Sequence, residues 1–181
     1  RNDNGILHNS VFILDKGKIL GFRDKAKLAN EDEFYENRQF VPGDFPGPIF
    51  LRGLRIGLPI CEDLWDPEVC ECLIEAGAEL ILSINGSTYN TAKMDQRINT
   101  IVSRVIENEI PIVYLNMVGG QDELLFDGGS FAINLSSGNS TSSPTGLEIT
   151  NNTFTNTYSG IHAQYYDAVT IRGNTISGAY M

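Results

Sequence analysis

LRIGLPICEDLWDPE, residues 54–68, passes from an apolar run to a cysteine and then directly to a helix start. The apolar run at residues 54–60 predicts a buried strand. Asp-Pro-Glu at residues 66–68 supplies an N-cap, a proline at the first helical position and an acid in the first turn. We therefore expect a helix over residues 66–76. Cys61 stands between the two elements, at the carboxyl edge of the predicted strand.

Further strands and helices alternate on both sides of this stretch. Upstream, two short apolar runs flank Lys16-Gly17, which is the pattern of a β-hairpin, and a loop-like segment rich in proline and glycine follows. Downstream, two apolar runs enclose a segment with apolar residues at helical spacing. This order predicts an α/β layered fold up to residue 134. The expected elements are strands 11–15, 18–23, 79–84 and 110–118, a helix at 91–108 and a loop at 30–49.

The composition changes after residue 134. Residues 135–145 are rich in Ser, Thr and Gly, which is typical of a flexible linker. Residues 146–181 contain two similar stretches, 147–154 and 169–176, which are 22 residues apart. A period near 22 with alternating apolar residues resembles the coils of a right-handed parallel β-helix, although about three coils are needed for stability.

Charge and cysteine content limit the classes of partner. The formal net charge is −10, which argues against nucleic acid and against an anionic membrane surface, because both select for basic patches. No apolar run reaches the roughly 18 residues of a membrane span, and residues 1–20 do not resemble a signal peptide. Three cysteines are an odd number, so a disulfide framework is not expected and a reducing, cytoplasmic location is.

Cys61 is the strongest candidate for chemistry. Backbone N–H groups at a turn before a helix can hold an oxyanion, and a helix N-terminus favours the thiolate. The alternative is a buried structural cysteine, which is the more frequent role of a lone cysteine. The only histidines, His8 and His162, lie far from Cys61 in sequence, so an activated thiol needs a carboxylate base and a cationic partner.

The nitrilase superfamily uses that arrangement, with a glutamate base, a lysine and a cysteine nucleophile. Lys25-Ala26-Lys27-Leu28, followed by EFYENRQF at residues 33–40 and by a Pro-Gly pair, resembles its catalytic-lysine segment. By this resemblance Lys25 takes the catalytic place, with Lys27 as the near competitor, and Glu36 is the second glutamate that positions the lysine. Ala29 stands where the family usually has proline, and we expect it to alter only a local turn.

Other motifs resemble the glutaminase domain of glutamine-dependent NAD synthetases more closely than other nitrilase branches. They are CEDLW at 61–65, SINGS at 83–87 with Lys93 and Arg97 downstream, YLNMVGGQDE at 114–123 and FDGGS at 126–130. The resemblance implies a partial nitrilase-like αββα sandwich over residues 1–134, followed by about two β-helix-like coils. It also implies hydrolysis of the glutamine side-chain amide through a thioester on Cys61.

The same resemblance suggests residues for binding the substrate. Glu62 and Ser87 are candidates for holding the α-amino group, and Phe34 for packing against the side chain. Lys93 and Arg97, four apart at a helix start, are candidates for steering the carboxylate. The alternatives are a solvated turn residue for Glu62, a loop hydroxyl for Ser87, a core aromatic for Phe34 and a solvent-facing pair for the two basic residues.

Two parts of the family pattern lie outside this sequence. Only 24 residues precede Lys25, and none resembles the segment that carries the general-base glutamate, so we expect weak or no hydrolysis by this chain alone. Residues 135–181 contain no Ser-Gly-Gly-rich phosphate loop, so ATP and Mg are expected only in a separate synthetase domain and no cofactor in this chain. The expected partners are glutamine, that domain and further copies in a homo-oligomer.

Two alternative functions remain open at this level. The first is a related amidase or nitrilase that acts on a different amide or nitrile. The second is a non-catalytic binding or structural module built on the β-helix-like part, which predicts further 22-residue coils after Met181.

Overall fold

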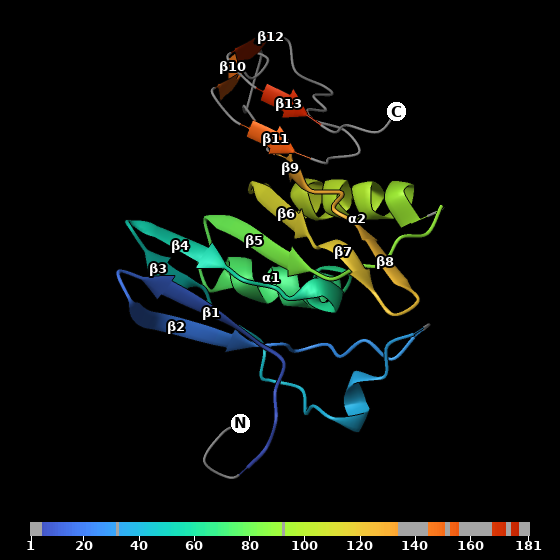
Figure 1. The fold of residues 1–181 in the computed structure, drawn as a ribbon. Helices are drawn as coiled ribbons and strands as arrows, with labels where there is room; N and C mark the ends of the chain where they lie inside the picture. Colours follow the sequence, from blue (N-terminus) through green and yellow to red (C-terminus); the bar gives the residue numbers. More distant parts are fainter. Residues whose placement is uncertain are drawn as a thin grey trace.

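A computed structural model describes residues 5–31, 33–91 and 93–133 and four short strands between residues 145 and 177. Its centre is a five-stranded sheet in the order β3-β4-β5-β6-β9 (Figure 1). The three inner strands are parallel, and the edge strands β3 and β9 run antiparallel to their neighbours. The strands are β3 (Ile49–Leu51), β4 (Leu54–Gly57), β5 (Leu80–Asn85), β6 (Ile112–Asn116) and β9 (Phe131–Ile133). The fold is mixed α/β, as predicted.

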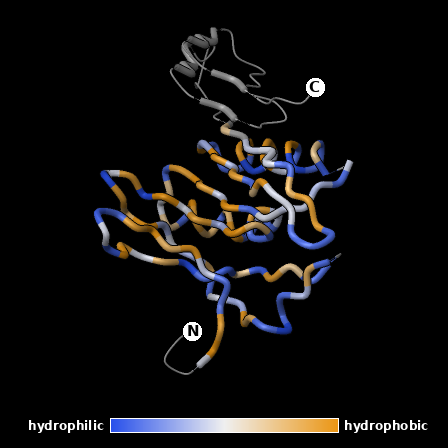
Figure 2. The backbone as a smooth tube through the Cα atoms, in the orientation of Figure 1, coloured by the Kyte–Doolittle hydropathy of each residue, from blue (hydrophilic) through white to orange (hydrophobic). Residues whose placement is uncertain are grey.

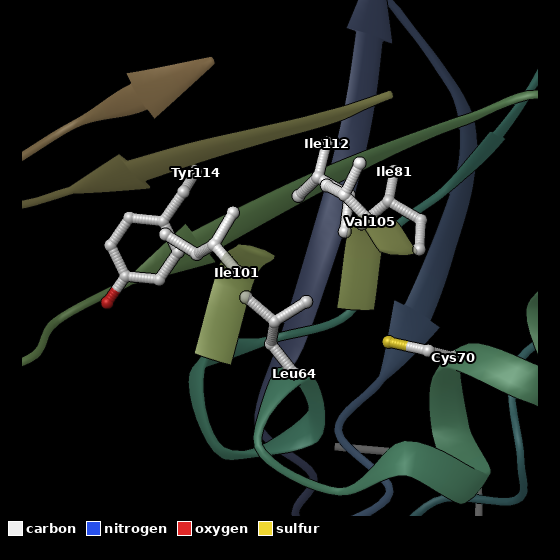
Figure 3. Packing of buried hydrophobic residues seen from close by; sticks show 7 residues of the cluster. All are labelled: Leu64, Cys70, Ile81, Ile101, Val105, Ile112 and Tyr114. Carbon is white, nitrogen blue, oxygen red and sulfur yellow. The ribbon is translucent and has the colours of Figure 1, made fainter. Parts of the chain in front are cut away.

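Two helices, α1 (Pro67–Glu75) and α2 (Lys93–Asn108), cover one face of this sheet. The Asp66 side chain caps α1 by accepting the N–H of Glu68, which confirms the predicted helix start. Figure 3 shows the core between helices and sheet, where fully buried side chains from α1, α2, β5 and β6 pack together. Its members are Leu64, Cys70, Ile81, Ile101, Val105, Ile112 and Tyr114.

A hairpin lies on the opposite face, over the β3 and β4 side of the sheet. It consists of β1 (Ser10–Asp15) and β2 (Lys18–Asp24), joined by Lys16 and Gly17, both with positive φ, as a tight two-residue turn requires. Apolar residues of β1 pack against a buried cluster on β3 and β4. The strands are the main hydrophobic segments in Figure 2, as expected for a layered core. The predicted hairpin is confirmed.

Some boundaries differ from prediction. The expected strand at 110–118 divides into β6 and β7 (Val118–Gln121), and β7 pairs with β8 (Leu124–Asp127) as a separate hairpin. The strand divides there because its neighbour β5 ends opposite Asn116, and the chain beyond has no parallel strand to pair with. Similarly, β4 ends before Pro59, which has no N–H to donate.

The predicted loop at 30–49 contains a short 3-10 helix, η1 (Glu36–Arg38), and a second one, η2 (Cys61–Leu64), joins the sheet to α1. None of the helices among the described residues is long and apolar enough to cross a membrane.

Four strands are described in the C-terminal part. They are β10 (Thr145–Thr150), β11 (Thr153–Thr155), β12 (Ala168–Arg172) and β13 (Thr175–Ser177). β10 pairs in parallel with β12, and β11 with β13. Leu147 lies opposite Val169, 22 residues on, as the sequence period predicts. The predicted linker, apart from Thr145, lies outside the described residues, and the β-helix coils stay a prediction.

Gly43 sits against the end of β2. Its N–H donates to the carbonyl of Lys25 at 2.8 Å, and a Cβ placed on it would lie 2.6 Å from the Cβ of Asp24. A side chain therefore has no room at this position. Gly47, in the same loop, has open space around it.

Gly43→Ala is expected to lower the free energy of unfolding by about 1–3 kcal/mol, because the methyl group displaces the strand end. Urea denaturation followed by circular dichroism measures the change, with Gly47→Ala as the matched control. Equal midpoints for the two variants would show that the loop yields without resistance.

Candidate active site

A cavity of about 740 Å³ lies at the carboxyl edge of the parallel strands, where ligands bind in open α/β sheets. Lys25 reaches it from the end of β2 and Cys61 from beyond β4, while Ser87 follows β5. The structure brings together seven of the eight residues singled out in the sequence. These are Lys25, Phe34, Glu36, Cys61, Glu62, Ser87 and Lys93.

Cys61 opens η2 with a φ of 49°, in the left-handed region that few residues other than glycine adopt. Such strained backbone is concentrated at functional sites. Burial raises the pKa of the Cys61 thiol, while the Lys25 ammonium and the backbone N–H of Gly86 act in the opposite direction. The thiolate is therefore favoured by one charge and one fixed hydrogen-bond donor, which is the environment of a reactive cysteine.

Lys25 and Glu36 form a buried ion pair. The Nζ to Oε2 distance is 2.5 Å, and the side chains are 3% and 12% exposed. The same carboxylate accepts the Ala29 N–H at 2.7 Å and the Asn9 amide at 2.6 Å. Burial tends to raise the pKa of Glu36, but the hydrogen bonds from Lys25 and the other two donors outweigh it and lower the pKa. Glu36 is thus ionised and fixes the lysine.

Lys27, the competing lysine, has different partners. Its ammonium pairs with Asp66 at 2.8 Å and with Glu68 at 3.5 Å, and it lies over the Phe45 ring. It is not among the described residues that line the cavity. Position therefore distinguishes Lys25 from Lys27, although the two lysines are only two residues apart.

Glu62 carries a negative charge into a mixed electrostatic environment. Burial raises the pKa of this carboxyl, Lys25 lowers it, and the nearby Glu31 raises it again. Lys93, also on the cavity wall, acts to lower it. The cavity thus presents carboxylates and ammonium groups together, which suits a small zwitterion.

Arg97 is the predicted site residue that the structure does not bring to this cavity. Its side chain is fully buried, and Nη1 donates to both carboxylate oxygens of Asp127 at 2.8 and 2.9 Å. The remaining donors bind the Ser87 hydroxyl and the carbonyls of Ser87 and Thr88. Asn116 adds bonds to Ser87 and Asp127. Arg97 therefore holds the loop after β5 and neither contacts the cavity nor faces solvent.

Three wall groups were not singled out for the site in the sequence. Gly86 contributes a backbone N–H, which no side-chain pattern reveals, and Asn9 lies 27 residues from the glutamate it binds. Glu31 has only its closeness to Glu36 as a signal. Trp65, expected to serve in packing, also lies on the wall.

Comparisons with known proteins agree with this geometry. The family model described as carbon-nitrogen hydrolase matches residues 1–136. The chain belongs to the carbon-nitrogen hydrolase family. The matched residues include every element around the cavity, from the β1–β2 hairpin to β9.

Among curated relatives of this carbon-nitrogen hydrolase, the glutamine-dependent NAD(+) synthetase of Rhodobacter capsulatus is 42% identical over 127 residues, which cover 70% of this chain and 23% of that protein. The enzyme of the same name from Acinetobacter baylyi is 36% identical over 134 residues, covering 74% and 25%. The chain thus spans about a quarter of the length of these relatives.

Solved structures show the same likeness. The glutamine-dependent NAD+ synthetase of Acinetobacter baumannii, in complex with ADP, superimposes with a TM-score of 0.71 at 33% identity, covering 75% of this chain and 26% of that one. A mutant amidase from Nesterenkonia sp. AN1 gives 0.60 at 27% identity, covering 70% and 47%. That amidase carries the acetamide moiety of fluoroacetamide covalently at its active-site cysteine.

Arg97→Met is expected to lower the free energy of unfolding by about 3–5 kcal/mol, because it leaves the buried Asp127 carboxylate without its cation. Arg52→Met is the control, since Arg52 is 75% exposed and its pair with Asp15 is worth less than about 1 kcal/mol. Urea denaturation of both variants measures the difference. A loss at position 97 no larger than at position 52 would contradict the buried role.

Proposed function

We propose that this chain carries the glutamine-hydrolysing site of a glutamine-dependent NAD synthetase, with Cys61 as the nucleophile. The observation that carries the proposal is the buried Lys25–Glu36 pair on the same cavity wall as Cys61. A lysine fixed by a glutamate beside a cysteine provides a cation for an oxyanion without any histidine. The similarity to two NAD synthetases at 36–42% identity supports glutamine as the amide.

In the proposed reaction, the Cys61 thiolate attacks the carbon of the glutamine side-chain amide. The Lys25 ammonium and the backbone N–H of Glu62 stabilise the oxyanion that forms, and such donors are worth about 3 kcal/mol each. The carbon–nitrogen bond then breaks, and the nitrogen leaves as ammonia after taking up a proton. Water attacks the thioester, releasing glutamate and restoring the thiol. Glu36 keeps Lys25 in place through both steps.

The polar residues of the wall suit the two ends of an amino acid. The Glu62 carboxylate and the Ser87 hydroxyl are proposed to bind the α-ammonium group, and Lys93 the α-carboxylate. Phe34 packs against the methylene groups between the charged end and the amide. A simple aliphatic amide has no charged groups for Glu62 and Lys93, so these residues favour glutamine over it.

The runner-up function is an amidase that acts on small amides, which the likeness to the Nesterenkonia amidase supports. For the fold we propose a partial αββα sandwich in residues 1–134. We also propose β-helix-like coils in the tail, supported by the parallel β10–β12 and β11–β13 pairs at the predicted period. A separate synthetase domain, further copies of the chain and a cytoplasmic location complete the proposal, and the free state of all three cysteines fits a reducing compartment.

A diazoketone analogue of glutamine, which alkylates nucleophilic cysteines, is expected to label Cys61, because the analogue carries both charged groups of the substrate. Peptide mass spectrometry locates the label, and Cys72, which is also partly exposed, is the internal control. Glutamine is expected to protect Cys61, whereas butyramide is not. Protection by butyramide as strong as by glutamine would favour the amidase function instead.

The 181-residue chain by itself is expected to release ammonia from glutamine far more slowly than a typical enzyme turnover of about 1 s⁻¹. The reason is that Glu36 is a poor base: its pKa is lowered and its oxygens already accept three hydrogen bonds. An enzyme-coupled ammonia assay measures the rate. Typical turnover that Cys61→Ala abolishes would refute this prediction.

A further inference from the structure

Asp63 is almost fully buried, at 1% exposure, and its carboxylate joins two distant segments. Oδ1 accepts the backbone N–H groups of Ala26 and Lys27 at 3.0 and 2.7 Å. Oδ2 accepts the backbone N–H of Ile60 at 2.9 Å. One side chain thus satisfies three main-chain donors that lie on both sides of the cavity residues.

The donors are the immediate neighbours of the two central residues of the site. Ala26 and Lys27 directly follow Lys25, and Ile60 directly precedes Cys61. We propose that Asp63 is a positioning residue that ties the Lys25 strand end to the Cys61 turn, so that the lysine ammonium stays beside the thiol. This inference deepens the proposed glutaminase and rests on it only for the purpose of the arrangement.

The backbone at Cys61 gives a second reason. A non-glycine residue in a rare conformation costs about 1–3 kcal/mol and persists only where the surroundings fix it. Asp63 binds the N–H on one side of Cys61 and belongs to the same 3-10 helix on the other side. Its carboxylate therefore holds the strained turn from both directions.

The hydrogen-bond pattern requires a carboxylate. An ionised carboxylate only accepts, whereas an asparagine in its place would turn an NH₂ group toward backbone N–H donors. Burial raises the pKa of Asp63, while the backbone hydrogen bonds and the charge of Lys25 act to lower it. Asparagine is thus a nearly isosteric change that removes part of the attachment.

Positioning and simple charge removal predict opposite shifts at Cys61. The charged groups that face this thiol are Lys25, which lowers its pKa, and Glu62 and Glu36, which raise it. Removing the negative charge of Asp63 without movement would lower the thiol pKa or leave it unchanged. Losing the position of Lys25 would raise it.

The experiment measures the rate at which iodoacetamide alkylates Cys61 in the 181-residue chain as a function of pH, with the site read by peptide mass spectrometry. Asp63→Asn and Lys25→Met are each expected to raise the midpoint by about 1 pH unit. The double variant is expected to shift no further than Lys25→Met alone. A midpoint that Asp63→Asn leaves unchanged or lowers would overturn the proposal.

Asp66→Asn is the matched control. Asp66 lies three residues on, caps α1 and pairs with Lys27 rather than Lys25. This variant is expected to lower thermal stability without moving the midpoint of Cys61 alkylation. An equal upward shift in Asp66→Asn would show that general loosening explains the effect, and would also overturn the role of Asp63.

If circular dichroism shows that Asp63→Asn does not fold, Lys27→Pro and Lys27→Ala decide the question. Both remove the lysine side chain, but only proline also removes the N–H that Asp63 accepts at 2.7 Å. Lys27→Pro is expected to raise the midpoint above that of Lys27→Ala, and equal midpoints would refute the proposal. Because thiol reactivity needs no glutamine, failure of glutamine labelling would reject the glutaminase while leaving this result standing.

Discussion

The ion pair between Lys25 and Glu36 is the interaction on which the site depends. An ammonium group at 3% exposure is tolerated only when a charge of opposite sign meets it, because removing an ion from water costs several kcal/mol. The segment between the two residues must therefore fold back until Glu36 reaches the end of β2. Asn9 and the Ala29 N–H then fill the rest of the carboxylate, so β1 and the loop are fixed by the same contact.

A second network fixes the opposite wall. Arg97 and Asn116 meet Asp127 behind the loop that follows β5, so α2, β6 and the β7–β8 hairpin all act on the position of Ser87. The two networks use the same principle, a buried charge whose partners come from distant parts of the chain. Between them stands Cys61, whose strained backbone needs rigid surroundings on both sides.

Membership of the carbon-nitrogen hydrolase family and the local geometry agree on the kind of chemistry. A fixed lysine and a backbone N–H supply positive potential where an amide oxygen gains charge. The cavity adds carboxylates and a second lysine, which distinguish a zwitterion from a neutral amide. Family and site together therefore favour an amino-acid amide as the substrate, and the NAD synthetase relatives point to glutamine.

The sequence by itself determined the features that depend on local rules. The hairpin turn at Lys16-Gly17, the Asp66 cap and the periodicity of the two helices were readable because each rests on residues a few positions apart. Only the tertiary structure decided which way Arg97 points, since its partner Asp127 lies 30 residues away on another element. The Gly86 N–H and the Asp63 attachments were hidden for the same reason: their partners meet only when the strands assemble side by side.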